Sequence, residues 1–139
     1  MSMGWTLLAP RYWPTWLGLA LLRLFEPLPH RLLLALGAGL GAAVRRLPLG
    51  YVRVARTNIK LCLPELDGAA RGKLLQRHFR SLGAALFETA ISWWSSDRRV
   101  RELTQVEGME HLQAALARGR GAILLSAHFT TLEIGARAI

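Results

Sequence analysis

One short motif, SAHFTTLE at residues 126–133, has the residue types and spacing for proton transfer. His128 follows an apolar run, and Glu133 comes five residues later across two threonines. A neutral imidazole can accept the proton of a substrate hydroxyl, and a carboxylate on its other nitrogen fixes the tautomer and stabilises the imidazolium. The motif therefore predicts His128 as a general base and Glu133 as its acidic partner.

The spacing of the two residues restricts the geometry in which they can meet. Five residues along one continuous helix amount to about 140° beyond a full turn, so two helical side chains would face apart. His128 must therefore lie in a loop, with Glu133 in the first turn of the helix that follows. We expect Thr130 to cap that helix, because Thr130-Thr131-Leu132-Glu133 matches a T-x-x-E capping box. A competing interpretation is that Glu133 only caps the helix and His128 is incidental.

The same stretch limits the reaction types that need to be considered. No serine or cysteine is placed as a nucleophile beside a base, which favours direct transfer to an acceptor hydroxyl without a covalent enzyme intermediate. A metal site would need further ligands that this stretch lacks. We therefore expect neither a metal nor a cofactor.

The elements that must position His128 follow from the pattern of apolar residues. Residues 51–66 and 68–94 are expected to be helices, the second capped by Asp67. Strands are expected at LTQVEG (103–108) and GAILLSA (121–127), with an amphipathic helix at 109–119 between them. Strand, helix and strand would form a βαβ unit that delivers His128 at the carboxyl end of its second strand. The predicted fold class is α/β, with membrane-associated N-terminal helices followed by the start of a βαβ sheet.

The N-terminal part of the chain is apolar and strongly basic. Residues 1–60 carry eight basic groups and one acidic group, whereas residues 61–139 carry ten basic and eight acidic groups. This distribution favours an anionic membrane surface over nucleic acid, because the charges alternate with long aliphatic runs. An aromatic cluster of Trp5, Tyr12, Trp13 and Trp16 is typical of the headgroup level. Neither apolar stretch, 12–22 or 32–44, is long enough to cross a bilayer untilted.

We therefore predict a membrane-anchoring helical segment at residues 1–48 and an incomplete α/β domain at residues 49–139. The second domain is expected to be incomplete because the chain stops at Ile139, soon after a helix begins.

Several sequence blocks resemble one known family, the bacterial lipid A biosynthesis lauroyl acyltransferases of the broader lysophospholipid acyltransferase group. The blocks are RTNIKLCLPEL (56–66), HFRSLGAALFE (78–88) and the stretch from Val106 to Arg137, which contains the H-x4-E motif. The resemblance implies that His128 is the general base and Glu133 its acidic partner. Related branches have aspartate at the position of Glu133, so the glutamate makes this chain resemble the lauroyl-type branch more than the myristoyl type.

The resemblance also implies a bacterial inner-membrane enzyme on the cytoplasmic face. Such an enzyme transfers a fatty acyl chain from acyl carrier protein, its co-substrate, to a hydroxyl of a lipid A precursor. Because the family continues beyond the blocks present here, the 139-residue chain alone is expected to be inactive. Two alternatives remain open: a non-catalytic membrane-associated helical scaffold, and an acyltransferase that acts on glycerophospholipids.

Overall fold

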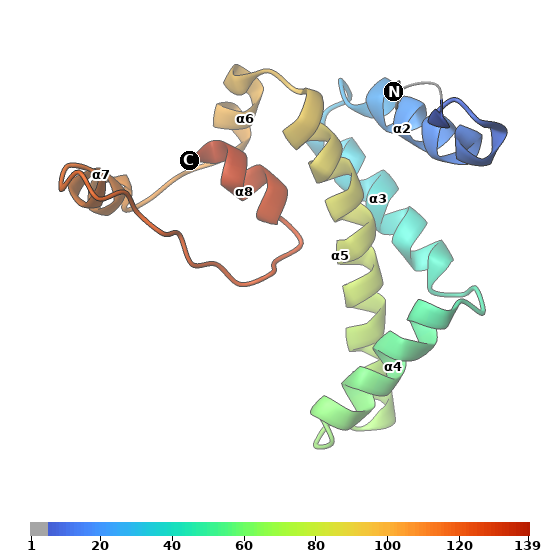
Figure 1. Ribbon diagram of the computed structural model, residues 1–139. Coiled ribbons are helices and arrows are strands. Elements are labelled where there is room, and N and C mark those ends of the chain that lie inside the picture. Colours follow the sequence, from blue (N-terminus) through green and yellow to red (C-terminus); the bar gives the residue numbers. More distant parts are fainter. Residues whose placement is uncertain (1–5) are drawn as a thin grey trace.

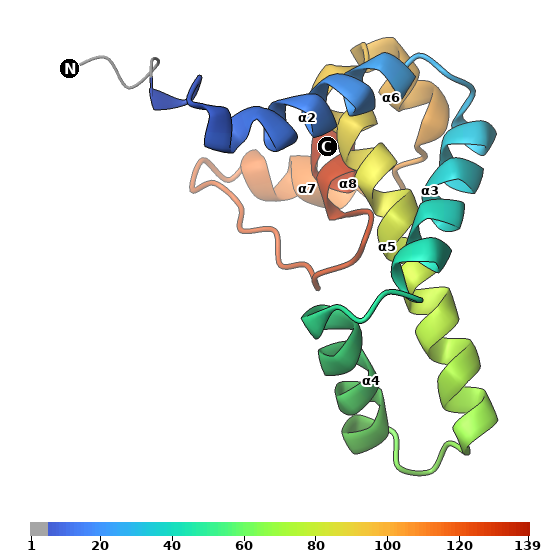
Figure 2. The same ribbon diagram turned by 90° about the vertical axis from the view of Figure 1, so that its right-hand side faces the viewer.

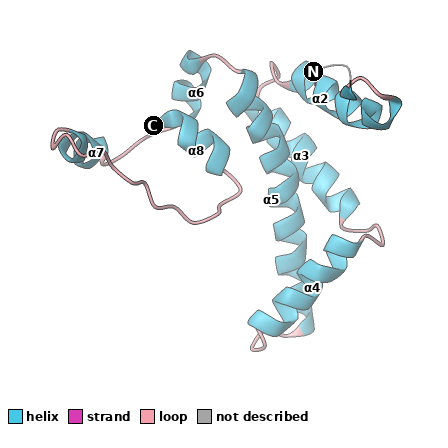
Figure 3. Ribbon diagram, viewed as in Figure 1, coloured by secondary structure: helices cyan, strands magenta, loops and turns pink. Residues whose placement is uncertain are grey.

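The structure is a computed structural model that describes residues 6–139, and the described residues form helices joined by turns and loops (Figure 3). A short 3-10 helix, η1 (Pro10–Tyr12), leads into the first long helix. The α-helices are α2 (Trp13–Phe25), α3 (His30–Val44), α4 (Gly50–Cys62), α5 (Gly68–Trp94), α6 (Asp97–Leu103), α7 (Met109–Leu116) and α8 (Leu132–Ala138).

The architecture is organised around α5, the longest helix, with α3 alongside it (Figure 1). Glycines allow the two backbones to approach. A Cβ atom at Gly37 or Gly41 of α3 would overlap the α5 backbone, and a Cβ atom at Gly83 of α5 would overlap Gly37. Because no larger residue fits at these three positions, the glycines set the separation of α3 and α5.

Two apolar clusters lie along this helix pair. The first consists of Leu33, Phe87, Ile91, Val100 and Ile134, contributed by α3, α5, α6 and α8. The second consists of Val52, Leu75 and Phe79, and it packs α4 onto α5. The first cluster positions the candidate site, because Ile134 belongs to the helix that carries Glu133.

The helix boundaries follow from local residue types. Pro27 and Pro29 separate α2 from α3, since two prolines cannot both continue one helix. The Asp67 carboxylate accepts a hydrogen bond from the Ala70 backbone N–H at 2.7 Å, which confirms Asp67 as the N-cap of α5. α4 ends at Cys62, just before Pro64.

The predicted sheet is wrong, because residues 6–139 contain no β-strand. The expected strands at 103–108 and 121–127 are instead connections that precede and follow α7 in the chain, apart from Leu103, which ends α6, and no backbone hydrogen bond joins them (Figures 1 and 3). Ile123 and Leu125 are 97% and 98% exposed, whereas a buried strand would cover both. An apolar run favours an extended segment that is buried by other parts of the protein. It does not specify the neighbouring strand, and a sheet forms only where such a strand supplies the backbone hydrogen bonds.

The predicted fold class also included membrane-associated N-terminal helices. Within residues 6–139 no helix combines the length and the apolar character needed to cross a membrane. α2 leads away from the α3–α5 pair (Figure 2), and its exposed side chains include Trp13, Trp16 and Leu17. Trp5, the remaining tryptophan of the predicted aromatic cluster, lies outside the described residues.

Candidate functional site

The segment 126–133 has the backbone that the spacing argument requires. His128 lies in the extended connection after Gly121, and α8 begins at Leu132 with Glu133 in its first turn. Both side chains are exposed. The prediction that His128 precedes the helix and Glu133 begins it is therefore confirmed at the level of the backbone.

The predicted capping box is wrong. The N-cap of α8 is Thr131, whose side chain makes no capping hydrogen bond. Thr130 instead places its Oγ1 3.2 Å from the Oγ of Ser81 on α5. Glu133 therefore does not form the capping box on which the competing interpretation of this residue depended.

The structure does not bring the two side chains of the predicted dyad into contact. Among residues 6–139, no hydrogen bond or ion pair joins the imidazole of His128 to the carboxylate of Glu133. The Glu133 backbone carbonyl, in contrast, accepts a hydrogen bond from Ser92 Oγ at 3.0 Å. The general-base role of His128 and the partner role of Glu133 stay predictions.

A cavity of about 340 Å³ lies between the segment that carries His128 and helix α8, and neither His128 nor Glu133 lines it. Its lining includes Leu124, Ser126 and Phe129 of the extended connection, together with residues of α8. Most of the exposed lining is apolar. A cavity of this kind accepts hydrocarbon more readily than a charged ligand.

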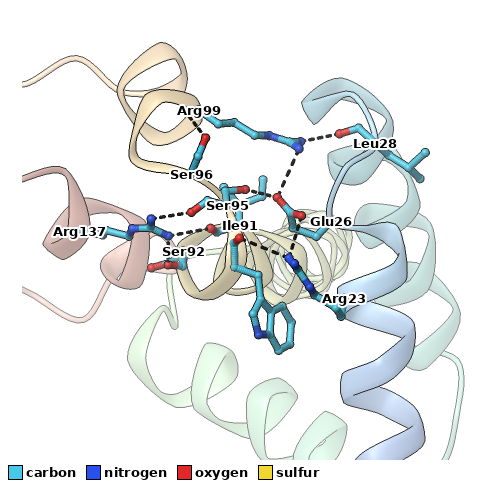
Figure 4. Close-up of polar contacts among 10 residues, drawn as sticks. Arg23, Glu26, Leu28, Ile91, Ser92, Ser95, Ser96, Arg99 and Arg137 are labelled. Carbon is cyan, nitrogen blue, oxygen red and sulfur yellow. Dashed lines mark hydrogen bonds and ion pairs between the residues drawn. The ribbon is translucent and has the colours of Figure 1, made fainter.

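Arg137 fixes α8, and with it Glu133, to the C-terminal end of α5 (Figure 4). Its guanidinium donates hydrogen bonds to the carbonyls of Ile91, Ser92 and Ser95, the last at 2.6 Å, and pairs with Asp97 at 2.8 Å. The last carbonyls of a helix have no partners within the helix, and the helix dipole makes that end attractive to a cation. Arg137 therefore acts as a C-terminal cap supplied by a different helix.

The same contact changes the titration of Asp97. The hydrogen bond from Arg137, and next the positive charge of that guanidinium, lower the pKa of the Asp97 carboxyl below its ordinary value. Arg101 contributes a smaller lowering. Asp97 is in turn the first residue of α6, so the ion pair ties α6 to α8.

A second polar cluster, around the buried carboxylate of Glu26, fixes the connection between α2 and α3 (Figure 4). Glu26 accepts a hydrogen bond from Ser95 Oγ and pairs with Arg23 at 3.2 Å and with Arg99 at 3.4 Å. Arg99 also donates to the Leu28 carbonyl at 2.6 Å. A buried carboxylate requires such partners, because its desolvation would otherwise be costly.

Sequence reasoning missed both of these polar clusters. The sequence pattern indicated no role for Arg137, whereas the structure uses it within the fold. For Glu26 a signal was available: it is the single acidic residue among the first 60, and an isolated carboxylate in a basic, apolar segment indicates a structural ion pair.

Comparison with known proteins identifies the class to which this chain belongs. The family model described as bacterial lipid A biosynthesis acyltransferase matches residues 1–139, so the chain belongs to that family. The resemblance found in the sequence blocks is thereby confirmed.

The chain is 42% identical over 131 residues to a lipid A biosynthesis lauroyltransferase of Escherichia coli K12, which covers 94% of this chain and 43% of that protein. It is 41% identical over 132 residues to a lipid A biosynthesis palmitoleoyltransferase of the same organism, with coverage of 95% and 43%. A lipid A biosynthesis acyltransferase of Haemophilus influenzae Rd is 40% identical over 134 residues, with coverage of 95% and 42%. The chain thus spans less than half the length of these curated relatives. No solved structure matches it.

Proposed function

We propose that this chain forms part of an enzyme that transfers a fatty acyl chain, of lauroyl type, from acyl carrier protein to a hydroxyl of a lipid A precursor. The observation that carries the proposal is the family membership across residues 1–139, together with the 42% identity to a protein named as a lauroyltransferase. The apolar cavity between the His128 segment and α8, although the histidine does not line it, supports an acyl substrate.

In the proposed reaction, His128 takes the proton of the acceptor hydroxyl as its oxygen attacks the thioester carbonyl of the donor. An ester C–O bond forms and the thioester C–S bond breaks. The proton passes from the imidazolium to the departing thiolate, and Glu133 stabilises the imidazolium while it exists. The two substrates supply every reacting group, so the proposal includes no cofactor and no covalent enzyme intermediate.

The proposal requires a local rearrangement. His128 must turn toward the first turn of α8, while Glu133 stays where Ser92 and Arg137 hold that helix. The segment that has to move, around residues 120–130, is exposed throughout, so its movement breaks no core packing.

Basic charge supports the proposed partners. Acyl carrier protein is acidic and the lipid A precursor carries phosphates, so both would be attracted to a chain with a net charge of +9. We also propose the cytoplasmic face of the bacterial inner membrane as the location, since residues 1–60 combine eight basic groups with exposed tryptophans and leucines.

The experiment compares variants of the full-length protein with labelled acyl carrier protein as donor. We expect His128→Ala to reduce acyl transfer by about 10²-fold or more, the usual contribution of a general base. We expect Glu133→Gln also to reduce it. The matched controls lie on α7: Glu110, like Glu133, is the second residue of its helix, and His111 follows it as an exposed histidine.

Glu110→Gln and His111→Ala should leave transfer unchanged. Transfer by His128→Ala at the rate of His111→Ala would overturn the catalytic assignment and favour the scaffold alternative. Label appearing in a glycerophospholipid in place of the lipid A precursor would overturn the proposed acceptor.

A further inference from the structure

The connection between α3 and α4 carries a cavity that the acyl-transfer proposal does not use. The cavity has a volume of about 450 Å³ and is lined by residues 45–50 together with Val52, Arg53 and Arg56. Four arginines contribute to it, Arg45, Arg46, Arg53 and Arg56, from the end of α3 and the first half of α4. No residue of the segment 120–139 lines it.

These four guanidinium groups have no acidic partner in the described part of the chain. Other arginines do: Arg23 and Arg99 pair with Glu26, Arg98 with Glu102, and Arg137 with Asp97. The sequence from residue 27 to residue 64 contains no aspartate or glutamate at all. Four like charges around one cavity repel one another, and an anion placed among them relieves that repulsion.

A buried donor gives an independent indication of a ligand. The Nε atom of Arg45 is buried and has no hydrogen-bond partner. Leaving a charged donor buried and unpaired is costly, and such an atom in a native protein calls for a partner that completes it. An oxygen atom of a ligand in the cavity that Arg45 lines would supply one once the side chain turns its Nε toward the cavity.

The rim of the cavity indicates the kind of anion. Leu47, which lines the cavity, is 50% exposed, and Pro48, which also lines it, is exposed as well. A soluble anion would gain nothing from these apolar groups, whereas an amphiphile would place its hydrocarbon against them. Arginine forks bind phosphate oxygens in pairs, which makes phosphate the preferred headgroup.

We propose that the α3–α4 cavity binds the phosphate headgroup of an anionic membrane phospholipid. The cavity stands apart from His128 and Glu133, so this inference goes beyond the proposed acyl transfer and survives if that proposal fails. Its role would be to fix the α3–α4 connection at the membrane surface by a specific lipid contact.

The experiment measures thermal unfolding of the full-length protein in neutral detergent micelles, titrated with short-chain phosphatidylglycerol or with phosphatidylcholine of the same chain length. We expect phosphatidylglycerol, and not phosphatidylcholine, to raise the Tm. Arg53→Ser combined with Arg56→Ser should weaken the apparent affinity for phosphatidylglycerol roughly 25-fold, since each surface arginine near an anionic lipid contributes about fivefold.

The control pair is Arg77→Ser with Arg80→Ser. These two arginines are also exposed and also lie three residues apart on one helix. Their substitution by serine removes the same charge as the first double variant. An equal loss of affinity in both double variants would overturn the proposal, because it would reduce the effect to net charge. A Tm increase with inorganic phosphate alone, matching that of phosphatidylglycerol, would overturn the assignment to a lipid.

Variants that fail to fold would be recognised by a low Tm in micelles without anionic lipid. In that event Arg53→Lys with Arg56→Lys keeps the charge and the fold but loses the paired donors. A weakened response to phosphatidylglycerol in this variant supports the cavity, and a full response overturns it.

Discussion

At the scale of single residues, Arg137 has the largest number of side-chain hydrogen bonds near the candidate site. Its guanidinium contacts three carbonyls at the end of α5 and the carboxylate of Asp97. Its side chain is 25% exposed, so solvent screens these bonds only in part. The residue therefore joins three helices, α5, α6 and α8, through one side chain.

We expect Arg137→Met to lower the free energy of unfolding by about 2–3 kcal/mol, because several charge-assisted hydrogen bonds are lost at once. The matched control is Arg98→Met. Arg98 also pairs with a carboxylate, that of Glu102, but its side chain is 83% exposed, so its loss should lower the stability far less than the loss of Arg137. Urea unfolding of both variants provides the measurement, and similar losses would contradict the capping role of Arg137.

Asp97 gives a prediction that depends on pH. Its pKa is lowered in the folded state, so it contributes stability above its unfolded pKa of about 3.9 and loses that contribution as the pH falls through its folded value. We expect Asp97→Asn to be less stable than the natural chain at pH 7 and to converge with it at strongly acidic pH. Unfolding measured across this range would contradict the ion pair if the difference stayed constant.

At the scale of secondary structure, most helices could be predicted from the sequence. The two strands that the sequence predicted are absent from residues 6–139. The Asp67 cap, the break at Pro27 and Pro29, and the end of α4 before Pro64 depend on residues within one turn of the boundary. The apolar run at 121–127 differs, because whether it becomes a strand depends on a partner elsewhere. The same reasoning applies to His128 and Glu133. Neighbouring residues in the sequence determine where their backbones lie, whereas contact between their side chains depends on the surrounding structure.

The packing of α3 on α5 gives a second prediction at this scale. Gly83→Ala should destabilise the protein by about 1–3 kcal/mol, because its methyl group would overlap the backbone at Gly37. Gly39→Ala is the control on α3, where an added Cβ meets nothing within 4 Å. That substitution should stabilise the helix by about 0.5–1 kcal/mol. Chemical unfolding of the two variants should therefore give changes of opposite sign, and a stabilised Gly83→Ala would contradict the close contact.

At the scale of the whole molecule, the arginines serve two different purposes, and the sequence alone does not show which arginine serves which. The basic residues of segment 1–60 were predicted together as a surface for an anionic membrane. In the structure Arg23 of this segment pairs with the buried carboxylate of Glu26, whereas Arg53 and Arg56 line an open cavity without acidic partners in the described residues. Composition alone could not distinguish these roles, because the distinction depends on which carboxylates and carbonyls each guanidinium reaches.

The exposed run from Ile123 to Leu125 has a further consequence for the chain as a whole. An extended segment with uncovered side chains and unpaired amides is a template for intermolecular β pairing. In a concentrated solution of this 139-residue chain, the same run on another copy offers a surface of matching pattern. We expect self-association through these residues to compete with the monomer, and a charge introduced at Leu125 to shift that balance toward the monomer.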